Sequence, residues 1–423
     1  MTNPANPTHA AAAGPEAASM PRAPRSGRAT ELTIATGVAL ASLSFSVWWP
    51  FIPLYVLDLG ATSDADALFW VAIATTAQGL SRLATGPFWG ILSDRVGRKL
   101  IFLRSLFMAS LTGVVMAFVA EPWQIALALM IQGIFSGFGP AGVALMSVTV
   151  PEHRLAPALS TVTGAQYLSA TLGPALGSLL ALGFGFKATI LIASLLPTIS
   201  GFMVLFTVPR DAVTPRAKKG ETLAAVEPFH WTRQFLLSVF LLFVVYSTAQ
   251  LIRTAAPITL KDITGNDDVS GLTGIAFTAS GIASVVAIIV GAQSFFRAGR
   301  MRVALTATCA VSAAAYLLVA GASGAPMFLA GFVIVTMLQS AMIPAVNTLI
   351  ANNVSRERRG TGFGIASSAQ ALSFAAGPLG AAAFAAVSFS GGFLAVGAFM
   401  LAVAALIYLS LREVRPEAPG AGT

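Results

Sequence analysis

The sequence predicts an all-α membrane protein with twelve transmembrane helices in two pseudo-symmetric six-helix bundles. Three observations predict this fold class: the composition, a series of long apolar runs, and an internal repeat. Of the 423 residues, 56% are hydrophobic and only 10% are charged, whereas soluble chains average about 25% charged residues. With a mean hydropathy of +0.79, the chain is neither a soluble enzyme nor disordered, and its apolar side chains must face lipid.

The apolar runs define the expected spans. A helix needs about 20 predominantly apolar residues to cross the hydrocarbon core of a bilayer, and the chain offers such a run twelve times. The expected spans are 33–57, 67–91, 100–120, 123–148, 157–181, 186–208, 234–260, 271–294, 302–321, 326–350, 361–386 and 391–411.

The segments outside the spans complete the domain organisation. Residues 1–30 are rich in alanine and proline and hold no separate apolar segment before a cleavage site, so we expect a disordered tail and no cleaved signal peptide. The expected order is a cytoplasmic tail (1–30), an N-terminal six-helix bundle (31–209), a central cytoplasmic loop (210–232), a C-terminal six-helix bundle (233–411) and a cytoplasmic tail (412–423).

The distribution of basic residues sets the orientation. If the spans alternate in direction, 21 of the 25 Lys and Arg residues fall on one side, whereas the opposite loops hold only Lys187 and Lys261 and collect acids. Basic loops stay in the cytoplasm. We therefore expect a multi-pass protein of the cell membrane, the inner membrane in a bacterium, with both termini cytoplasmic. The basic residues form no stripe alternating with aromatics, so nucleic-acid binding is not expected.

An internal repeat relates the two halves at an offset of 204 residues. Composition bias matches alanines or leucines by chance, but it does not match prolines, glutamines and an arginine in one register. Two bundles with a site between them at mid-membrane are an architecture of transporters. The matched pairs include Pro140 with Pro344, Arg154 with Arg358, Gln166 with Gln370, and Gly173-Pro174 with Gly377-Pro378.

A charged loop follows the second span. Its glycines permit a tight turn and close helix approach, and its aspartate can accept hydrogen bonds from an arginine or lie at a helix end, which would latch one conformation. The segment resembles the G-x-L-x-D-R-x-G-R-[KR] loop of the major facilitator superfamily. Its constrained positions are Gly90, Leu92, Asp94, Arg95, Gly97, Arg98 and Lys99.

The fifth span carries a second motif, Gly173-Pro174-Ala175-Leu176-Gly177. It is similar to the G-P-x-x-G-G motif of exporters in that superfamily, with Ser178 in place of the last glycine; the other interpretation is ordinary packing of small residues. Together with Pro50–Val56, Pro87–Gly90 and Leu103–Ser105, it resembles the twelve-span drug:proton antiporter branch, and within it the MdtG-like multidrug exporters.

This resemblance implies a major facilitator fold and a secondary active transporter that exports small organic molecules or drugs by alternating access. It also implies proton coupling, with the proton gradient as energy source and no cofactor. The expected partners are a small-molecule substrate and the lipid bilayer, and the expected state is a monomer.

The chain departs from that branch in two respects. Leu129 occupies the position of an arginine that the branch associates with proton coupling, and all 17 Asp and Glu residues map to tails, loops or span ends. Proton coupling must then use end-located acids such as Asp58 or Asp94, or protonation of the substrate itself.

The polar residues within the spans are candidates for a substrate cavity. An arginine at a helix centre costs at least about 2.5 kcal/mol, so Arg82 and Arg253 either face a cavity or snorkel to a surface. Glutamines equally serve as bonds between helices, and Trp48 and Trp49 either stack on a substrate or form an interfacial belt. The candidates are Arg82, Gln132, Gln166, Tyr246, Gln250, Arg253, Asn347 and Gln370.

The charge of these candidates keeps a second function open. Arg82 and Arg253 would make the cavity positive, which favours an organic anion such as a carboxylate, phosphonate or metallophore over a permanent cation. A non-transporting membrane receptor or scaffold is a third possibility. An enzyme is not expected, because the spans hold no catalytic Ser/His/Asp or Cys/His set, and the single cysteine Cys309 with three histidines forms no metal cluster.

Overall fold

The computed structural model describes residues 28–135, 137–150, 152–209, 231–290, 295–296, 299–354 and 359–412. Most of the three segments expected outside the bundles (1–27, 210–230 and 413–423) therefore lies outside the described residues. Within the described ranges every regular element is a helix, as the composition predicts.

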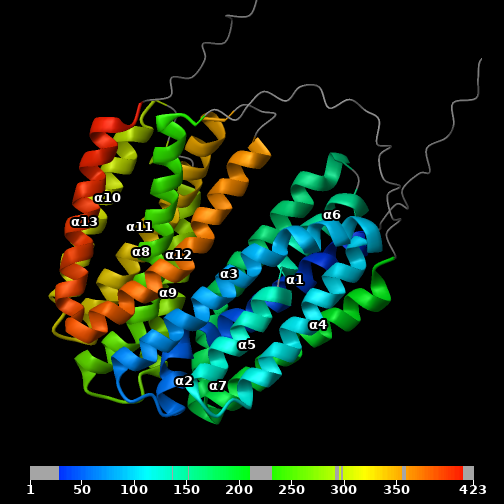
Figure 1. Ribbon diagram of the computed structural model, residues 1–423, viewed down its shortest axis with the longest axis horizontal. Coiled ribbons are helices and arrows are strands. Elements are labelled where there is room, and N and C mark those ends of the chain that lie inside the picture. The colour runs from blue at the N-terminus through cyan, green and yellow to red at the C-terminus, as the bar shows by residue number, and fades with distance from the viewer. Residues whose placement is uncertain are drawn as a thin grey trace, which may run out of the picture.

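The first half of the chain forms one group of helices, on the right of Figure 1. The first span comprises α1, the single turn η1 and α2, and the fourth comprises α5 and α6. The elements are α1 (Arg28–Trp48), η1 (Trp49–Phe51), α2 (Ile52–Asp58), α3 (Asp64–Val96), α4 (Arg98–Ala117), α5 (Pro122–Phe135), α6 (Phe138–Thr149) and α7 (Glu152–Thr207).

The second half forms the other group, on the left of Figure 1. Each of its helices corresponds to one expected span. The elements are α8 (Arg233–Thr264), α9 (Ser270–Val290), α10 (Met301–Ala320), α11 (Ala325–Asn352), α12 (Arg359–Val387) and α13 (Phe389–Ser410).

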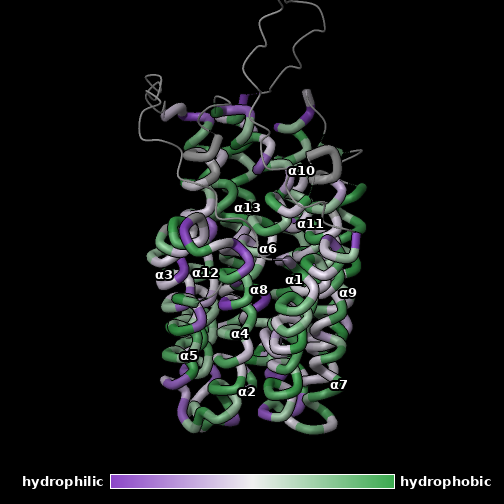
Figure 2. The backbone as a smooth tube through the Cα atoms, turned by 90° about the vertical axis from the view of Figure 1, so that its right-hand side faces the viewer, coloured by the Kyte–Doolittle hydropathy of each residue, from purple (hydrophilic) through white to green (hydrophobic). Residues whose placement is uncertain are grey.

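Ten segments of the described chain are long and apolar enough to cross a membrane, and Figure 2 shows apolar residues along the length of the helices. One of them, Pro157–Thr207, has 51 residues, or about 76 Å at 1.5 Å per residue, which is more than two bilayer cores. It is broken at Gly185, whose φ of 77° is not helical, and so provides two spans. Helix α3 is long enough, with 33 residues, but it is not among the ten segments because it is less apolar: it carries Arg82 and several polar side chains.

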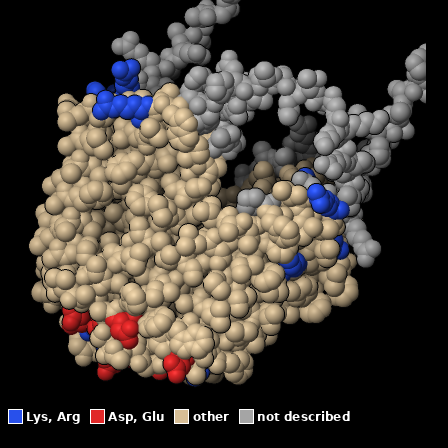
Figure 3. All heavy atoms as spheres, in the orientation of Figure 1, with Lys and Arg blue, Asp and Glu red and all other residues tan. Residues whose placement is uncertain are grey.

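The charges separate along the helix axes. In Figure 3, Lys and Arg gather at one end of the molecule and Asp and Glu at the other. We call these the basic end, which includes Arg98, Arg233 and Arg412, and the acidic end, which includes Asp64 and Asp267. This separation is the one that the loop composition predicts.

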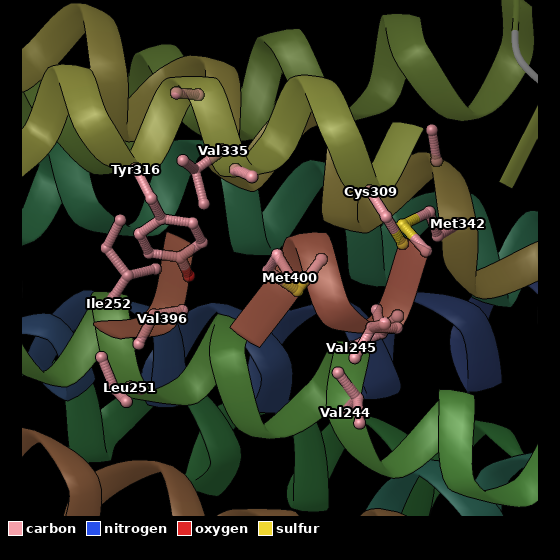
Figure 4. Close-up of a cluster of buried hydrophobic side chains, with 14 of the residues drawn as sticks. Val244, Val245, Leu251, Ile252, Cys309, Tyr316, Val335, Met342, Val396 and Met400 are labelled. Carbon is pink, nitrogen blue, oxygen red and sulfur yellow. The ribbon is translucent and has the colours of Figure 1, made fainter. Parts of the chain in front are cut away.

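The two groups of helices pack together toward the acidic end and diverge toward the basic end (Figure 1). Phe51, Leu54 and Leu68 of the first group belong to the same buried apolar cluster as the core of the second group. Figure 4 shows part of that core around Tyr316 and Met400. Apolar packing therefore joins the groups at the acidic end, whereas their helices diverge toward the basic end.

One ion pair crosses between the groups at the acidic end. The Lys261 Nζ lies 3.6 Å from Asp64 Oδ1 and 3.3 Å from Asp267 Oδ1. Lys261 and Asp64 are 27% and 36% exposed, so their attraction contributes only about 0.2–1 kcal/mol. A contribution of that size changes a two-state population by about 1.4- to fivefold.

We therefore expect Lys261→Met to shift the chain modestly toward a state open at the acidic end. Double electron–electron resonance between spin labels at Val96 and Val303, both exposed toward the basic end, should gain a shorter distance component. The matched control is Lys187→Met, which removes a cation from the same end that interacts with Asp58 of its own group. Equal shifts in both variants would contradict a specific role for the pair that crosses between the groups.

Candidate functional site

Two pairs of helices form the boundary between the groups: α3 against α12 and α7 against α9. Small residues bring α7 and α9 together, because a side chain at Gly274 would meet Ser178 and one at Gly281 would lie 2.9 Å from the Thr171 Cα atom. Further toward the basic end, a Cβ atom at Gly164 of α7 would meet nothing within 4 Å. The close contact between α7 and α9 thus lies around Thr171 and Ser178 of α7.

A cavity of about 450 Å³ lies in the basic half of the first group, the half where the two groups diverge. It has the size of a small-molecule site. Helices α3, α4, α5, α6 and α7 all contribute to its wall. The lining residues are Arg82, Thr85, Gly86, Trp89, Gly90, Ser93, Ile101, Arg104, Gly133, Gly137, Phe138, Gly139, Pro140, Ala141, Ala144 and Gln166.

A break in the fourth span forms one side of this cavity. Helix α5 ends at Phe135 and α6 begins at Phe138, with Gly137 between them at a φ of 115°. The break frees the carbonyl of Ile134, which accepts hydrogen bonds from Trp89 Nε1 at 2.6 Å and from Thr85 Oγ1 at 3.1 Å. Interrupted helices occur at membrane depth where they line a cavity, so this break is a feature of the site.

Two arginines line the same cavity from different helices. Arg82 lies on α3 and Arg104 on α4, and the Arg104 guanidinium lies over the Trp89 ring, 3.4 Å from its centroid. Buried Nε and Nη1 atoms of Arg104 have no hydrogen-bond partner among the described residues. None of the described lining residues is acidic. The cavity therefore offers fixed positive charge, which suits carboxylates and phosphonates.

A second, much smaller crevice lies where the two groups meet. Arg253 and Gln250 of α8 line it together with Trp49, Val71 and Phe277. Its volume of about 20 Å³ holds one or two water molecules, so it excludes an organic substrate in this conformation. Arg253 interacts electrostatically with Tyr246, which in turn interacts with Tyr167 of α7. A substrate can thus reach Arg82 and Arg104 in the larger cavity, whereas the crevice beside Arg253 is too small to admit one.

The glutamines divide between two roles. Gln132 is buried and its Oε1 accepts a hydrogen bond from Gln78 Nε2 at 2.6 Å, so it joins α5 to α3 and is not available to a ligand here. Gln166 lines the larger cavity. Asn347 on α11 and Gln370 on α12 are half-buried and line neither of these two cavities.

The aromatic and apolar candidates are packing residues in this conformation. Trp48 is 4% exposed and packs edge-on against Phe45 at 5.0 Å, so it forms neither an interfacial belt nor a stacking surface. Trp49 stacks on Phe45 at 4.5 Å and lines the small crevice. Leu129 is fully buried in the apolar core of the first group, which is no environment for an ionised coupling residue.

The charged loop after α3 packs against the end of the sixth span. Gly97 has a φ of 99°, which separates α3 from α4 and which only glycine adopts readily. Lys99 Nζ donates hydrogen bonds to the carbonyls of Leu205, at 2.8 Å, and of Val208. These carbonyls lie at the end of α7 and lack helical partners. The side chain of Asp94 lies outside what the structure describes.

The glycines of the exporter-type motif allow two helices to touch. A Cβ atom at Gly173 would meet Ser46 of α1, and one at Gly177 would meet the carbonyl of Val47 and lie 2.8 Å from the Phe51 ring. In the other group, a Cβ atom at Gly377 would lie 2.6 Å from Gln250 Cβ.

The same offset of 204 residues that pairs Gly173 with Gly377 also pairs their contacts, Ser46 and Gln250. The repeat in the sequence therefore recurs as a repeated contact in space. Pro174, in the middle of α7, is buried beside this contact.

Sequence reasoning missed Arg104, Trp89 and the broken fourth span. Arg104 was expected among the loop cations of the basic side, but it lies within α4 and lines the cavity. The signal for the break is Gly137-Phe138-Gly139-Pro140 in the middle of an apolar run, since glycine and proline together interrupt helices.

Comparison with known proteins gives consistent matches. The sequence model of the Major Facilitator Superfamily matches residues 34–252 and 238–423. The chain is 30% identical over 380 residues to the multidrug resistance protein MdtG of Proteus mirabilis, covering 87% of this chain and 91% of that protein. It is also 30% identical over 398 residues to MdtG of Klebsiella pneumoniae, covering 90% and 93%.

Solved structures share the fold. A bacterial homologue of the human lysosomal transporter Spinster, in an inward-facing and occupied conformation, superposes with a TM-score of 0.71 at 14% identity, covering 92% of this chain and 97% of that one. The human organic anion transporter TETRAN superposes with a TM-score of 0.65 at 17% identity, covering 90% and 99%.

Proposed function

Because the chain belongs to the major facilitator superfamily, we propose that it exports small organic molecules, including drugs, by alternating access. One structural observation carries the proposal: the two groups of helices pack together at the acidic end and diverge toward the basic end, where a cavity of about 450 Å³ lies among helices α3 to α7 of the first group. About 30% identity over most of the length of MdtG multidrug resistance proteins supports drugs as cargo.

The proposed orientation places the basic end and both termini in the cytoplasm. It follows from the excess of Lys and Arg at that end, since such loops are retained on the cytoplasmic side. In this orientation the present conformation faces inward, and an exporter loads its substrate in that state. We further propose that one chain is the working unit, because the two helix groups of a single chain enclose the pathway, and that it binds no nucleic acid.

The proposed energy source is the proton gradient. Leu129 is buried in apolar surroundings, and the described acids lie at helix ends or in links, among them Asp58 at the end of α2. The coupling proton is therefore carried by an end-located acid such as Asp58 or Asp94, or by the substrate. The charged loop Gly90–Lys99 is proposed as the gate, since Lys99 fixes its position to the end of α7.

A second candidate function is the export of organic anions. The observation that favours it is the pair of arginines in the larger cavity, with no acid among its described lining residues. A permanent cation in that cavity would be repelled without a counter-ion, and the low dielectric would enlarge the penalty.

Transport into inside-out membrane vesicles tests these proposals. A panel of anionic, neutral and permanently cationic drugs is offered with an imposed proton gradient, with the same gradient collapsed by a protonophore, and in vesicles without the protein. We expect gradient-dependent accumulation of at least one compound, together with raised tolerance to it in overexpressing cells. Uptake that is independent of the gradient would contradict proton coupling, and absence of transport for all classes would favour a receptor or scaffold.

A further inference from the structure

A separate cavity lies at the basic end of the second group, outside the space between the two groups. Its volume is about 580 Å³. It is formed by the start of α8, the start of α10 and the end of α13, and Figure 1 shows α10 and α13 on the side away from the first group. The lining residues are Thr232, Arg233, Gln234, Arg302, Leu409, Ser410, Leu411 and Arg412.

Three helices each bring one arginine to this cavity: Arg233 from α8, Arg302 from α10 and Arg412 after α13. None of the described lining residues is acidic. The first turns of α8 and α10 begin here as well, and helix N-termini carry positive partial charge. Convergent guanidinium groups with planar donor arrays suit phosphate oxygens.

Hydrogen bonds hold the walls of the cavity in place. Gln234 Nε2 donates to the Ser410 carbonyl at 2.8 Å, and the Arg412 backbone N–H donates to Gln234 Oε1 at 3.1 Å. Arg233 Nη2 donates to Ser410 Oγ at 3.4 Å. The single side chain of Gln234 thus ties the start of α8 to the end of α13. A ligand would meet a preformed site and not a set of mobile surface side chains.

The surroundings of the cavity are those of a lipid headgroup region. Leu409 is 80% exposed and Tyr408, whose ring lies 5.5 Å from the Arg302 guanidinium carbon, is 57% exposed. Trp231, directly before α8, is 61% exposed. Tyr and Trp mark the level where headgroups meet the hydrocarbon. Apolar surface for acyl chains therefore adjoins cationic surface for a phosphate.

We propose that this cavity binds the phosphodiester headgroup of an anionic phospholipid from the adjoining leaflet. Its arginines contact the phosphate oxygens, and the acyl chains follow the exposed face of α13 beside Leu409. The bound lipid bridges α8, α10 and α13. Basic pockets between transmembrane helices are the general type of site that holds such headgroups.

Native mass spectrometry of the full-length protein with added phosphatidylglycerol tests the proposal, with phosphatidylcholine as the reference lipid. We expect the wild type to retain phosphatidylglycerol preferentially. Arg302→Gln combined with Arg412→Gln should weaken this retention about 25-fold, because each cation near the surface favours an anionic lipid about fivefold. The matched control is Arg28→Gln with Arg300→Gln, which removes the same charge from exposed positions at the same end.

Equal loss of lipid in both double variants would overturn the proposal, since it would reflect overall charge and not the cavity. Displacement of the lipid by excess inorganic phosphate would also overturn it, because the site would then select a free anion. If the double variant does not fold, Arg412→Gln alone, at the end of the described chain, should still weaken retention while Arg300→Gln does not. Unchanged retention in Arg412→Gln would count against the site.

Discussion

Replacing Gly177 by alanine is expected to abolish transport, because the added methyl group would occupy the space of the α1 backbone. The new Cβ atom would meet the Val47 carbonyl and lie 2.8 Å from the Phe51 ring. A carbonyl oxygen cannot rotate away as a side chain can, so α7 and α1 must separate. Overpacking in a well-packed core costs about 1–3 kcal/mol even where side chains can adjust, and here the backbone sets the limit.

The same substitution elsewhere in α7 provides the control. Gly164→Ala places its methyl group where nothing lies within 4 Å, and alanine favours the helix over glycine. We expect Gly164→Ala to retain transport and thermal stability in detergent, and Gly177→Ala to lose both. Normal transport by Gly177→Ala at equal expression would show that α7 and α1 do not need this close approach.

The repeat extends this expectation to the second group. Gly377 approaches α8, with its Cβ position 2.7 Å from the Ser247 carbonyl and 2.8 Å from the Leu251 nitrogen. The exporter-type motif is thus a packing feature that occurs once in each half. The sequence already paired Gly173 with Gly377, but only the structure shows that their partners, Ser46 and Gln250, carry the same offset.

The fold could be predicted from the sequence because lipid imposes a simple rule. Every span must be a helix of about 20 apolar residues, so runs of hydropathy locate the helices, and the alternating loops predict which charges share an end of the molecule. The breaks followed less directly. Gly185 falls in the link expected between the spans 157–181 and 186–208. The break at Gly137, which divides α5 from α6, was not expected, because it depends on a local glycine and not on a periodic pattern.

The candidate site was less predictable, since it depends on which helix faces meet. Gln132 and Gln166 are equivalent in sequence terms, yet Gln132 pairs with Gln78 whereas Gln166 lines the cavity. The presence of Gln78 on α3 opposite Gln132 accounts for the different roles of the two glutamines. Arg104 was overlooked because its position near a basic loop resembles that of the other cations at the basic end, and only the tertiary contact with Trp89 places it in the site.

We expect removal of Arg82 or Arg104 to reduce the export of anionic compounds selectively. Both side chains line the larger cavity with no acid among its described lining residues. A hydrogen bond to a charged group contributes about 1.5–3 kcal/mol, so Arg82→Met and Arg104→Met should each lower anion transport by roughly tenfold or more. Neutral compounds should be affected little, because they gain no charge-assisted bond.

The conservative variant separates charge from geometry. Arg82→Lys keeps the cation but loses the planar fork that pairs with a carboxylate or phosphonate through two bonds, so it should restore only part of the anion transport. Arg300→Met removes an exposed cation at the basic end that does not line the larger cavity, and it should change nothing. Vesicle transport of one anionic, one neutral and one quaternary ammonium compound measures all four variants side by side.

A quaternary ammonium dye provides the strongest test of the charge argument. With two guanidinium groups in the wall and the cavity open at the basic end, such a dye must overcome repulsion that water screens only partly in a narrow space. Removing Arg82 should therefore raise dye export, if export is measurable, while anion export falls. Efficient wild-type export of the dye that is unchanged in Arg82→Met and Arg104→Met would contradict a role for this cavity in selecting substrates by charge, and would leave drug export itself as the function that remains.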